Sequence, residues 1–325
     1  MVESRGRAGL PWLVADVGGT NARFGWVADP AQGVQQVRQL PVAGHRTPAD
    51  AVRHYLALLP AGAQPRCAAI AVATAVQGDV IELTNSHWRF SRQALQAELG
   101  LQTLLVLNDF EALALSLPRL QAHQLRGHGA LPTGQGTLAV IGPGTGLGVG
   151  GVVPTPQGWV ALPGEGGHAT LAPADDFESA LLQQVRTRFA HVSAERLLSG
   201  IGLPVLHDAV CAVAGVAAPG LAAEHIVERG LAGDELCSRT LDSFCALLGS
   251  FAGNVALTLG ARGGVYIGGG IVPRLGERFF TSTFRARFEA KGRFQAYLAG
   301  IPTALITDTL AALAGAALAI EQHPG

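Results

Sequence analysis

Short apolar runs that end in glycine pairs alternate with longer stretches of helical spacing along this 325-residue chain. Residues 13–17 form one such run, and a strand-like pattern resumes at residues 24–27, which predicts a β-hairpin. The same pattern returns at residues 137–141 and 149–153, on either side of a second glycine-rich turn. Two such hairpins with helices between them indicate a duplicated α/β core, each half a sheet with helices packed on it.

Further elements are predicted from hydrophobic periodicity and from the turn residues that bound it. The predicted strands are residues 68–74, 80–83, 104–107, 265–267 and 301–306. The predicted helices are residues 51–59, 91–99, 176–189, 193–198, 203–214 and 234–259, with one more after residue 306. The first helix follows Thr47-Pro48, a pair typical of a helix N-terminus, and the longest is expected to stop at Gly260.

The composition excludes several classes of protein. The chain is 48% hydrophobic and 14% charged, a mixture that can bury a large core, and its length favours two domains. With 23 basic and 24 acidic residues, it has no net field to attract nucleic acid or an anionic membrane. The four cysteines lack metal-ligand spacing, and the longest small-apolar run, residues 309–320, is too short to span a bilayer. We therefore expect a cytoplasmic protein with reduced thiols.

Short polar side chains accompany the first glycine turn, in the stretch from Ala15 to Asn21. Glycine lets backbone amides approach a phosphate because it has no Cβ in the way. Asp16 at the strand end could hold Mg²⁺ through water, and Thr20 could contact the transferred phosphate. A simple hairpin turn is the alternative interpretation of a lone glycine pair. The neighbouring Asp, Thr and Asn favour the phosphate site.

The second glycine turn, residues 142–148, has the glycine density of an anion-binding loop. Lys291 is the only lysine in the chain, so the Walker pattern is excluded here. A glycine-rich loop alone is a weak indication. Two such turns at matching places in the two halves of the predicted core are a stronger indication, since together they could bind both ends of a triphosphate.

Asp109 follows a predicted buried strand directly after Asn108. Phosphoryl transfer needs a residue that orients the acceptor hydroxyl and takes its proton, and an aspartate commonly does this. The alternative is that the Asn-Asp pair only caps a helix.

Two carboxylates and an imidazole lie in or near a glycine-rich region further along the chain, at Glu165, Glu195 and His168. Such groups bind vicinal hydroxyls, which a sugar ring presents. His168 could instead be a buried, satisfied histidine, and residues 193–196 could be the first turn of a helix. The cluster from Thr84 to Trp88 could form one wall of a sugar pocket.

Taken in order, these motifs resemble the bacterial glucokinase family, which has the hexokinase-type, actin-like ATPase fold. The matching stretches cover nearly the whole chain: DVGGTNAR from Asp16, TNSHW from Thr84, LNDF from Leu107, GPGTGLGV from Gly142, LPGEGGH from Leu162, HVSAERLLSG from His191, GGVYIGGGIVPR from Gly263 and FEAKGRF from Phe288. The resemblance implies an α/β protein with the two-domain actin-like, ribonuclease H-like ATPase fold and an interdomain cleft. The small domain would comprise residues 1–110 plus 301–325, and the large domain residues 111–300.

The resemblance also implies an activity, which is ATP-dependent phosphorylation of glucose at the C6 hydroxyl in a cytoplasmic enzyme of glycolysis. Family members are commonly homodimers. Asp109 would be the catalytic base. The substrate-binding residues would be Asn85, Asn108, Asp109, Glu165, His168 and Glu195. The nucleotide would be bound by Ala15, Asp16, Val17, Gly18, Gly19, Thr20, Asn21, Gly144, Thr145, Gly146, Gly268, Gly269 and Gly270, with Mg²⁺ held by Asp16 through water.

Two other functions stay open from the residues themselves. One is a kinase for another hexose or an amino sugar, because the predicted pocket residues accept hydroxyls without reading each stereocentre. The other is a non-catalytic sugar sensor that binds glucose and a partner protein. The presence of Asp16, Asp109 and both glycine turns argues against the sensor.

Overall fold

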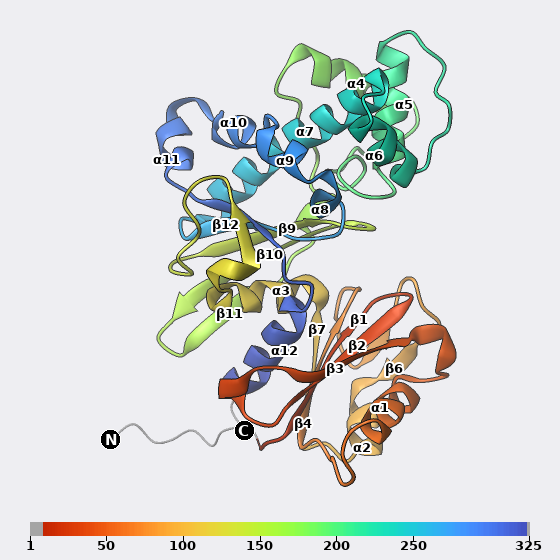
Figure 1. The fold of residues 1–325 in the computed structure, drawn as a ribbon, viewed down its shortest axis with the longest axis vertical. Helices are drawn as coiled ribbons and strands as arrows, with labels where there is room; N and C mark the ends of the chain where they lie inside the picture. The colour runs from red at the N-terminus through yellow and green to blue at the C-terminus, as the bar shows by residue number, and fades with distance from the viewer. Residues whose placement is uncertain (1–8, 324–325) are drawn as a thin grey trace. The chain divides into compact units, whose positions relative to one another are not determined.

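A computed structural model describes residues 9–323 as an α/β protein made of two compact units (Figure 1). Unit 1 comprises residues 1–120, 152–163 and 309–325, and unit 2 comprises residues 121–151 and 164–308. The domain bounds expected from the sequence stay a prediction, and their outermost residues, 1–8 and 324–325, lie outside the described part of the chain.

The first sheet lies in unit 1 and has the strand order β3-β2-β1-β4-β7. Its strands are β1 (Trp12–Val17), β2 (Asn21–Val27), β3 (Gln35–Pro41), β4 (Cys67–Val72) and β7 (Thr103–Asn108). The predicted hairpin is confirmed, since β1 and β2 pair antiparallel. Strands β1, β4 and β7 run parallel, with Val17, Val72 and Asn108 in one row. The carboxyl ends of these three strands therefore meet at the same edge of the sheet.

Both faces of the first sheet are covered, which explains why its parallel strands read as continuous apolar runs. On one face the sheet packs with α1 (Pro48–Ala57) and α2 (Arg92–Glu98). On the other it packs with α12 (Ala311–Gln322), drawn in blue in Figure 1. The predicted helix start is confirmed, because the Thr47 hydroxyl caps α1 by accepting the N–H of Asp50.

Two parts of unit 1 differ from the prediction. The predicted strand 80–83 is β5 (Val80–Glu82), and it pairs with an unpredicted strand, β6 (Arg89–Ser91), in a ribbon of its own. Helix α3 (Asp109–Ser116) was not predicted either, and it follows β7 without a loop. Residues 83–88 connect β5 to β6, and this segment carries part of the candidate site.

The second sheet repeats the strand order of the first, with one strand added at the end. Its strands, in spatial order, are β11 (Gly158–Leu162), β10 (Leu147–Thr155), β9 (Leu138–Pro143), β12 (Gly264–Ile267), β13 (Thr303–Ile306) and β8 (Leu125–Gly127). Strands β9, β12 and β13 run parallel, as β1, β4 and β7 do. The predicted duplication of the core is therefore confirmed.

Unit 2 contains the longest helix of the described chain together with seven other helices. They are α4 (Asp176–Arg186), α5 (Leu203–Val213), α6 (Ala223–Leu231) and α7 (Glu235–Leu259), followed by the short helices α8 (Val272–Leu275), α9 (Glu277–Thr281), α10 (Phe284–Glu289) and α11 (Gln295–Ala299). Short 3₁₀ turns complete the elements: Pro30–Gln32, Val42–Gly44, Leu117–Arg119, Ala122–Gln124, Gly166–His168 and Gly292–Phe294.

Helix α7 is the core helix of unit 2. It begins at the cap of Asp234 and ends, as predicted, at Gly260, whose φ of 62° is the left-handed conformation that glycine adopts readily. The helix has the length and apolarity of a membrane span, but 78% of its apolar window is buried inside the protein. A Cβ at Gly249 would overlap the carbonyl oxygen of Phe284, so α7 and α10 pack backbone against backbone.

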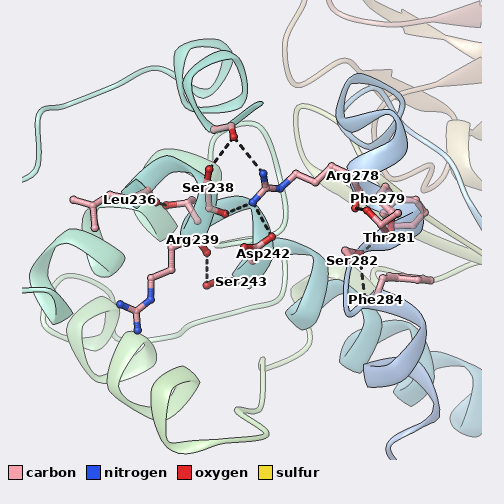
Figure 2. A network of polar contacts seen from close by, with 12 residues as sticks. Leu236, Ser238, Arg239, Asp242, Ser243, Arg278, Phe279, Thr281, Ser282 and Phe284 are labelled. Carbon is pink, nitrogen blue, oxygen red and sulfur yellow. Dashed lines mark hydrogen bonds and ion pairs between the residues drawn. The ribbon is translucent and has the colours of Figure 1, made fainter. Parts of the chain in front are cut away.

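An arginine network ties three helices of unit 2 together (Figure 2). Arg278 on α9 donates to the carbonyl oxygens of Gly230 on α6 (3.2 Å) and Ser238 on α7 (2.9 Å). It also pairs with the Asp242 carboxylate at 2.8 Å. The network joins the C-terminal end of α6 to the first turn of α7 and to α9, so it holds these three helices together.

The contact of α12 with α3 leads to a test of the fold. A Cβ at Gly315 would overlap the carbonyl oxygen of Ala112. Helix propensity alone would make Gly315→Ala stabilising by about 1 kcal/mol. We expect the opposite sign, a loss of about 1–3 kcal/mol in the free energy of unfolding, because the backbones must move apart.

Urea denaturation measures this change. Ala312→Gly on the same helix is the matched control for propensity, and it should cost about 1 kcal/mol. A stabilised Gly315→Ala protein would contradict the close packing of the two helices.

Candidate functional site

The first glycine turn is held against a segment distant in sequence. The Gly18 N–H donates to the carbonyl oxygen of Asn21 (2.9 Å) and closes the turn between β1 and β2. A Cβ at Gly19 would lie 2.6 Å from the carbonyl oxygen of Asn85. Only glycine therefore fits at position 19, and the structure brings the predicted residue Asn85 beside the turn. Asn85 and Thr20 are both exposed.

Asp16 lies one residue before the end of β1, on the sheet face that carries α12. Arg23 is its cross-strand neighbour, with 3.8 Å between Nη1 and Oδ2, and Arg23 also donates to the Thr309 carbonyl oxygen. Burial raises the pKa of Asp16, and the Arg23 charge opposes that shift. Mg²⁺ commonly binds through one carboxylate plus phosphate oxygens and water, and a single, partly buried Asp16 fits that pattern.

No denser metal cluster exists among residues 9–323, where no group of three or more His, Cys, Asp or Glu side chains is placed to hold an ion.

Asn108 and Asp109 lie where β7 passes into α3. Asn108 caps the helix, since its Oδ1 accepts the Phe110 N–H at 2.9 Å and its Nδ2 donates to the Thr74 carbonyl oxygen at 3.1 Å. Asp109 is the first residue of α3, and its Oδ1 also accepts the Phe110 N–H, at 3.0 Å. The capping alternative is thus correct for Asn108. Asp109 is held by the helix N-terminus, which stabilises a carboxylate.

Glu111 and Thr74 were missed by the sequence reasoning. The Glu111 carboxylate accepts the Asn108 N–H, so Glu111 and the Asn108 side chain both hold the N-terminus of α3, where Asp109 is the first residue. The spacing Asn-x-x-Glu in the sequence is the signal that could have found it. Thr74 follows β4, and its hydroxyl lies 3.3 Å from that of Thr84, so it links Asn108 to the segment that carries Asn85.

The register of the sheet places these groups at one edge. Val17 and Asn108 occupy the same row across β1, β4 and β7, so the first glycine turn and Asp109 both follow that row. Two strand spacings separate them, roughly 10 Å. Unit 1 therefore brings Asp16, the glycine turn, Asn85 and Asp109 to the carboxyl edge of its parallel strands.

The second glycine turn connects β9 to β10 in unit 2. The Gly144 N–H donates to the Gly146 carbonyl oxygen (2.9 Å), and the Gly200 N–H donates to the Gly144 carbonyl oxygen (2.8 Å). The third glycine run packs directly on it. Gly269 has a φ of 77°, a Cβ there would overlap the Pro143 carbonyl oxygen, and Ile271 donates to that same oxygen at 3.2 Å. The structure therefore joins the second turn to residues 268–270.

His168 and Glu195 come together in unit 2, and Glu165 directly precedes the turn that carries His168. The Glu195 N–H donates to the Gly167 carbonyl oxygen at 2.9 Å, and His168 Nδ1 lies 4.0 Å from Glu195 Oε1. His168 is 60% exposed, so the alternative of a buried histidine is wrong. A Cβ at Gly167 would overlap the Leu147 carbonyl oxygen, which explains the glycine at this position, whereas a Cβ at Gly164 would meet no atom within 4 Å.

The predicted helix at residues 193–198 is wrong. These residues form turns, because the backbone N–H groups of Ala194 and Glu195 donate to the carbonyls of Ala169 and Gly167 and not to a preceding helical turn. This conformation gives Glu195 a contact that was not expected. Its Oε2 accepts the Leu147 N–H at 2.9 Å, so it braces the second glycine turn.

The glycine turns and the polar side chains suit two different ligands. Glycine turns with open backbone suit a polyanion, and carboxylates with an exposed imidazole suit a polyol. Comparison with known proteins names the family that combines them, since the Glucokinase family model matches residues 13–323. The chain belongs to the glucokinase family.

Glucokinases of known sequence and structure resemble the chain over nearly its whole length. A glucokinase of Chromobacterium violaceum is 52% identical over 96% of this chain and 90% of its own. One of Neisseria meningitidis serogroup C is 48% identical over 98% of this chain and 97% of its own. A crystal structure of a glucokinase from an Antarctic psychrotroph is 38% identical, covers 96% of this chain and 99% of its own, and has a TM-score of 0.90. The fold is therefore the actin-like ATPase fold that the sequence predicted.

The close approach of Asn85 to the first turn can be tested by substitution. Gly19→Ala should lower the free energy of unfolding by about 1–3 kcal/mol, because Asn85 and the segment around it must move. Gly18→Ala is the matched control, since a Cβ there would meet its nearest neighbour, the Asn21 carbonyl oxygen, at an ordinary contact distance of 3.6 Å. Urea denaturation of both variants measures the difference. Equal effects of the two substitutions would contradict the contact.

Glu111 predicts a pH dependence of stability. Burial raises the pKa of Glu111 above its ordinary value, against the opposing effect of the Asn108 N–H. Between the unfolded and the folded pKa the native state binds more protons, so this group makes stability fall as pH rises. Glu111→Gln keeps an acceptor for Asn108 and removes the charge. Its stability relative to wild type should therefore increase as pH rises from about 4 to neutrality.

Urea denaturation at several pH values measures this difference. Glu82→Gln, at a residue whose side chain is 75% exposed, controls for the loss of one charge. A Glu111→Gln protein that weakens relative to wild type as pH rises would show that the hydrogen bond outweighs burial.

Proposed function

We propose that the chain is an ATP-dependent glucokinase, which transfers the γ-phosphoryl group of ATP to the C6 hydroxyl of glucose and yields glucose 6-phosphate and ADP. The observation that carries the proposal is the placement of Asp109. This carboxylate begins α3 at the same strand edge as the first glycine turn, in a member of the glucokinase family. A proton acceptor and a phosphate-binding turn at one edge are what phosphoryl transfer to a hydroxyl requires.

The groups proposed for sugar binding are described within each unit separately. In unit 1 these are Asn85, Asn108 and Asp109, and Asn108 keeps only part of its hydrogen-bonding capacity because it also caps α3. In unit 2 they are Glu165, His168 and Glu195. One oxygen of Glu195 is engaged by the Leu147 N–H, which leaves the oxygen facing His168 for a sugar hydroxyl.

The nucleotide is assigned to the glycine turns. Residues 15–21 would contact the transferred phosphate, residues 144–146 the other phosphates and residues 268–270 the adenosine. The direct packing of Gly269 on Pro143 supports placing the last two together. Mg²⁺ would arrive with ATP and neutralise phosphate charge, with Asp16 holding it through water. Burial raises the pKa of Asp16, and a nearby cation would lower it again.

In the proposed mechanism Asp109 orients the C6 hydroxyl and accepts its proton as the new O–P bond forms and the bond from the γ-phosphorus to the bridging oxygen of ADP breaks. The transition state of such transfers is loose, so positioning and charge neutralisation supply most of the acceleration. The residues of this chain contribute that positioning. The hydrogen bonds of the Asn108 side chain to Phe110 and of Glu111 to the Asn108 N–H fix the backbone from which Asp109 projects.

We further propose a cytoplasmic homodimer. The four cysteines are free and buried, which suits a reducing compartment, and both substrates are cytoplasmic metabolites. Light scattering of the purified protein tests the dimer directly.

A coupled assay of product formation tests the proposed function. It should include glucose, other hexoses and amino sugars as acceptors, with ATP, ADP and polyphosphate as donors. Preferred turnover of glucose with ATP supports the proposal. Preference for another sugar would assign a different kinase, and binding of glucose without turnover would assign a sensor.

Asp109→Asn is the decisive variant for the mechanism. Asparagine keeps an acceptor for the Phe110 N–H but cannot take a proton, so kcat should fall by about 10²- to 10⁴-fold with the fold intact. Steady-state kinetics and circular dichroism measure the two effects. Glu82→Gln, an exposed carboxylate of unit 1, is the control and should keep wild-type kcat. Near-normal turnover of Asp109→Asn would remove Asp109 from the role.

A further inference from the structure

Three histidines of unit 1 that the proposed function does not use form one chain of hydrogen bonds. Nε2 of His45 lies 2.8 Å from Nδ1 of His54 on α1, and Nε2 of His87 lies 3.0 Å from the carbonyl oxygen of His45. Nδ1 of His45 lies 2.9 Å from the carbonyl oxygen of Pro41, the last residue of β3. Both ring nitrogens of His45 are thus engaged within the protein, so the ring links two elements of the fold.

The Pro41 carbonyl group fixes the tautomers of this pair. A carbonyl oxygen can only accept a hydrogen bond, so Nδ1 of a neutral His45 must carry the proton. Nε2 of His45 is then an acceptor, and His54 must donate its Nδ1–H to it. The neutral imidazoles therefore have a single arrangement, which orients the ring of His45 between the end of β3 and α1.

The carbonyl oxygen of His45 is a double acceptor. It accepts the Nε2–H of His87 at 3.0 Å and the Nε1–H of Trp88 at 2.9 Å. Trp88 is 2% exposed and packs in the core that the first sheet forms with α1 and α2, where its indole N–H needs a partner. Because two consecutive side chains converge on one oxygen, the position of the His45 backbone determines the position of residues 87–88.

The short turn from β5 to β6 transmits that position to Asn85. The Leu83 N–H donates to the Trp88 carbonyl oxygen at 3.2 Å, the Ser86 N–H to the Leu83 carbonyl oxygen at 3.3 Å, and the Trp88 N–H to the Ser86 hydroxyl at 3.1 Å. The turn is therefore closed on itself, and it cannot move at one end alone. Asn85 lies within it, and the carbonyl oxygen of Asn85 is the atom that packs against Gly19.

We propose that His45 is a positioning residue for sugar binding: its ring, held by Pro41 and His54, fixes the turn that presents Asn85. The inference rests on the proposed function, since it takes Asn85 as a sugar-binding residue. It assigns His45 no contact with sugar or nucleotide and no part in proton transfer. Loosening the ring should therefore weaken glucose binding and leave turnover at saturating substrates unchanged.

His54→Ala removes the partner of the ring from an exposed position on α1 and leaves His45 in place. The dissociation constant and the KM of glucose should rise roughly two- to tenfold, as expected for the loss of one hydrogen bond. The values of kcat and of the KM of ATP should stay those of wild type. Calorimetric titration of glucose and steady-state kinetics measure these quantities.

His45→Ala and the double variant with His54→Ala test whether the two rings act as a pair. His45→Ala should raise the dissociation constant of glucose at least as much as His54→Ala, because it also loses the bond to Pro41. Adding His54→Ala to it should change nothing further, because the partner is already gone. His45→Asn should recover part of the affinity, since its amide can still donate to Pro41 from the place of Nδ1.

Arg53→Ala is the matched control, because Arg53 directly precedes His54 on α1, is exposed, and pairs with Asp50 and Glu98. It should leave glucose affinity unchanged. Unchanged glucose affinity in His54→Ala, additive effects in the double variant, or an equal rise in the KM of ATP would each overturn the inference. Wild type that binds glucose without phosphorylating it would contradict the proposed function alone, because the binding comparison still measures the role of His45.

Discussion

Backbone packed against backbone at a few glycines is the constraint on which the candidate groups within each unit depend. Gly19 lies against Asn85, Gly167 against Leu147, and Gly269 against Pro143. In each case a Cβ would meet the neighbouring carbonyl group, so no other residue permits the approach. These contacts bring loops from distant parts of the chain to the ends of parallel strands, where polar side chains can then converge.

The side chains of Asn108 and Glu195 each have a structural role and a proposed binding role. Asn108 caps α3 and also stands at the strand end where a sugar hydroxyl is expected. Glu195 accepts an N–H of the second glycine turn with one oxygen and faces His168 with the other. Such double use links the binding of a substrate to the shape of the backbone around it, because a group that is already hydrogen-bonded has few orientations left.

The fold was predictable wherever a local pattern determined it. The two hairpins, the cap of α1 at Thr47 and the end of α7 at Gly260 follow from strand alternation, capping chemistry and the left-handed preference of glycine. The helix expected at residues 193–198 failed because the backbone there bonds to residues 167–169, which no local pattern reveals. Helix α3 was missed because its first residues were interpreted mainly as catalytic and sugar-binding groups, although a helix cap was the alternative for them.

The sequence by itself determined the duplicated α/β core, the order of the motifs and the chemical type of each candidate residue, since these depend on periodicity and side-chain identity. Tertiary structure alone decided that Asn85 meets Gly19, that Glu195 braces the second glycine turn and that Trp88 donates to the His45 carbonyl oxygen. The physical reason is that these are contacts between residues far apart in the chain. They form only when the strands are in register, and no spacing in the sequence encodes them.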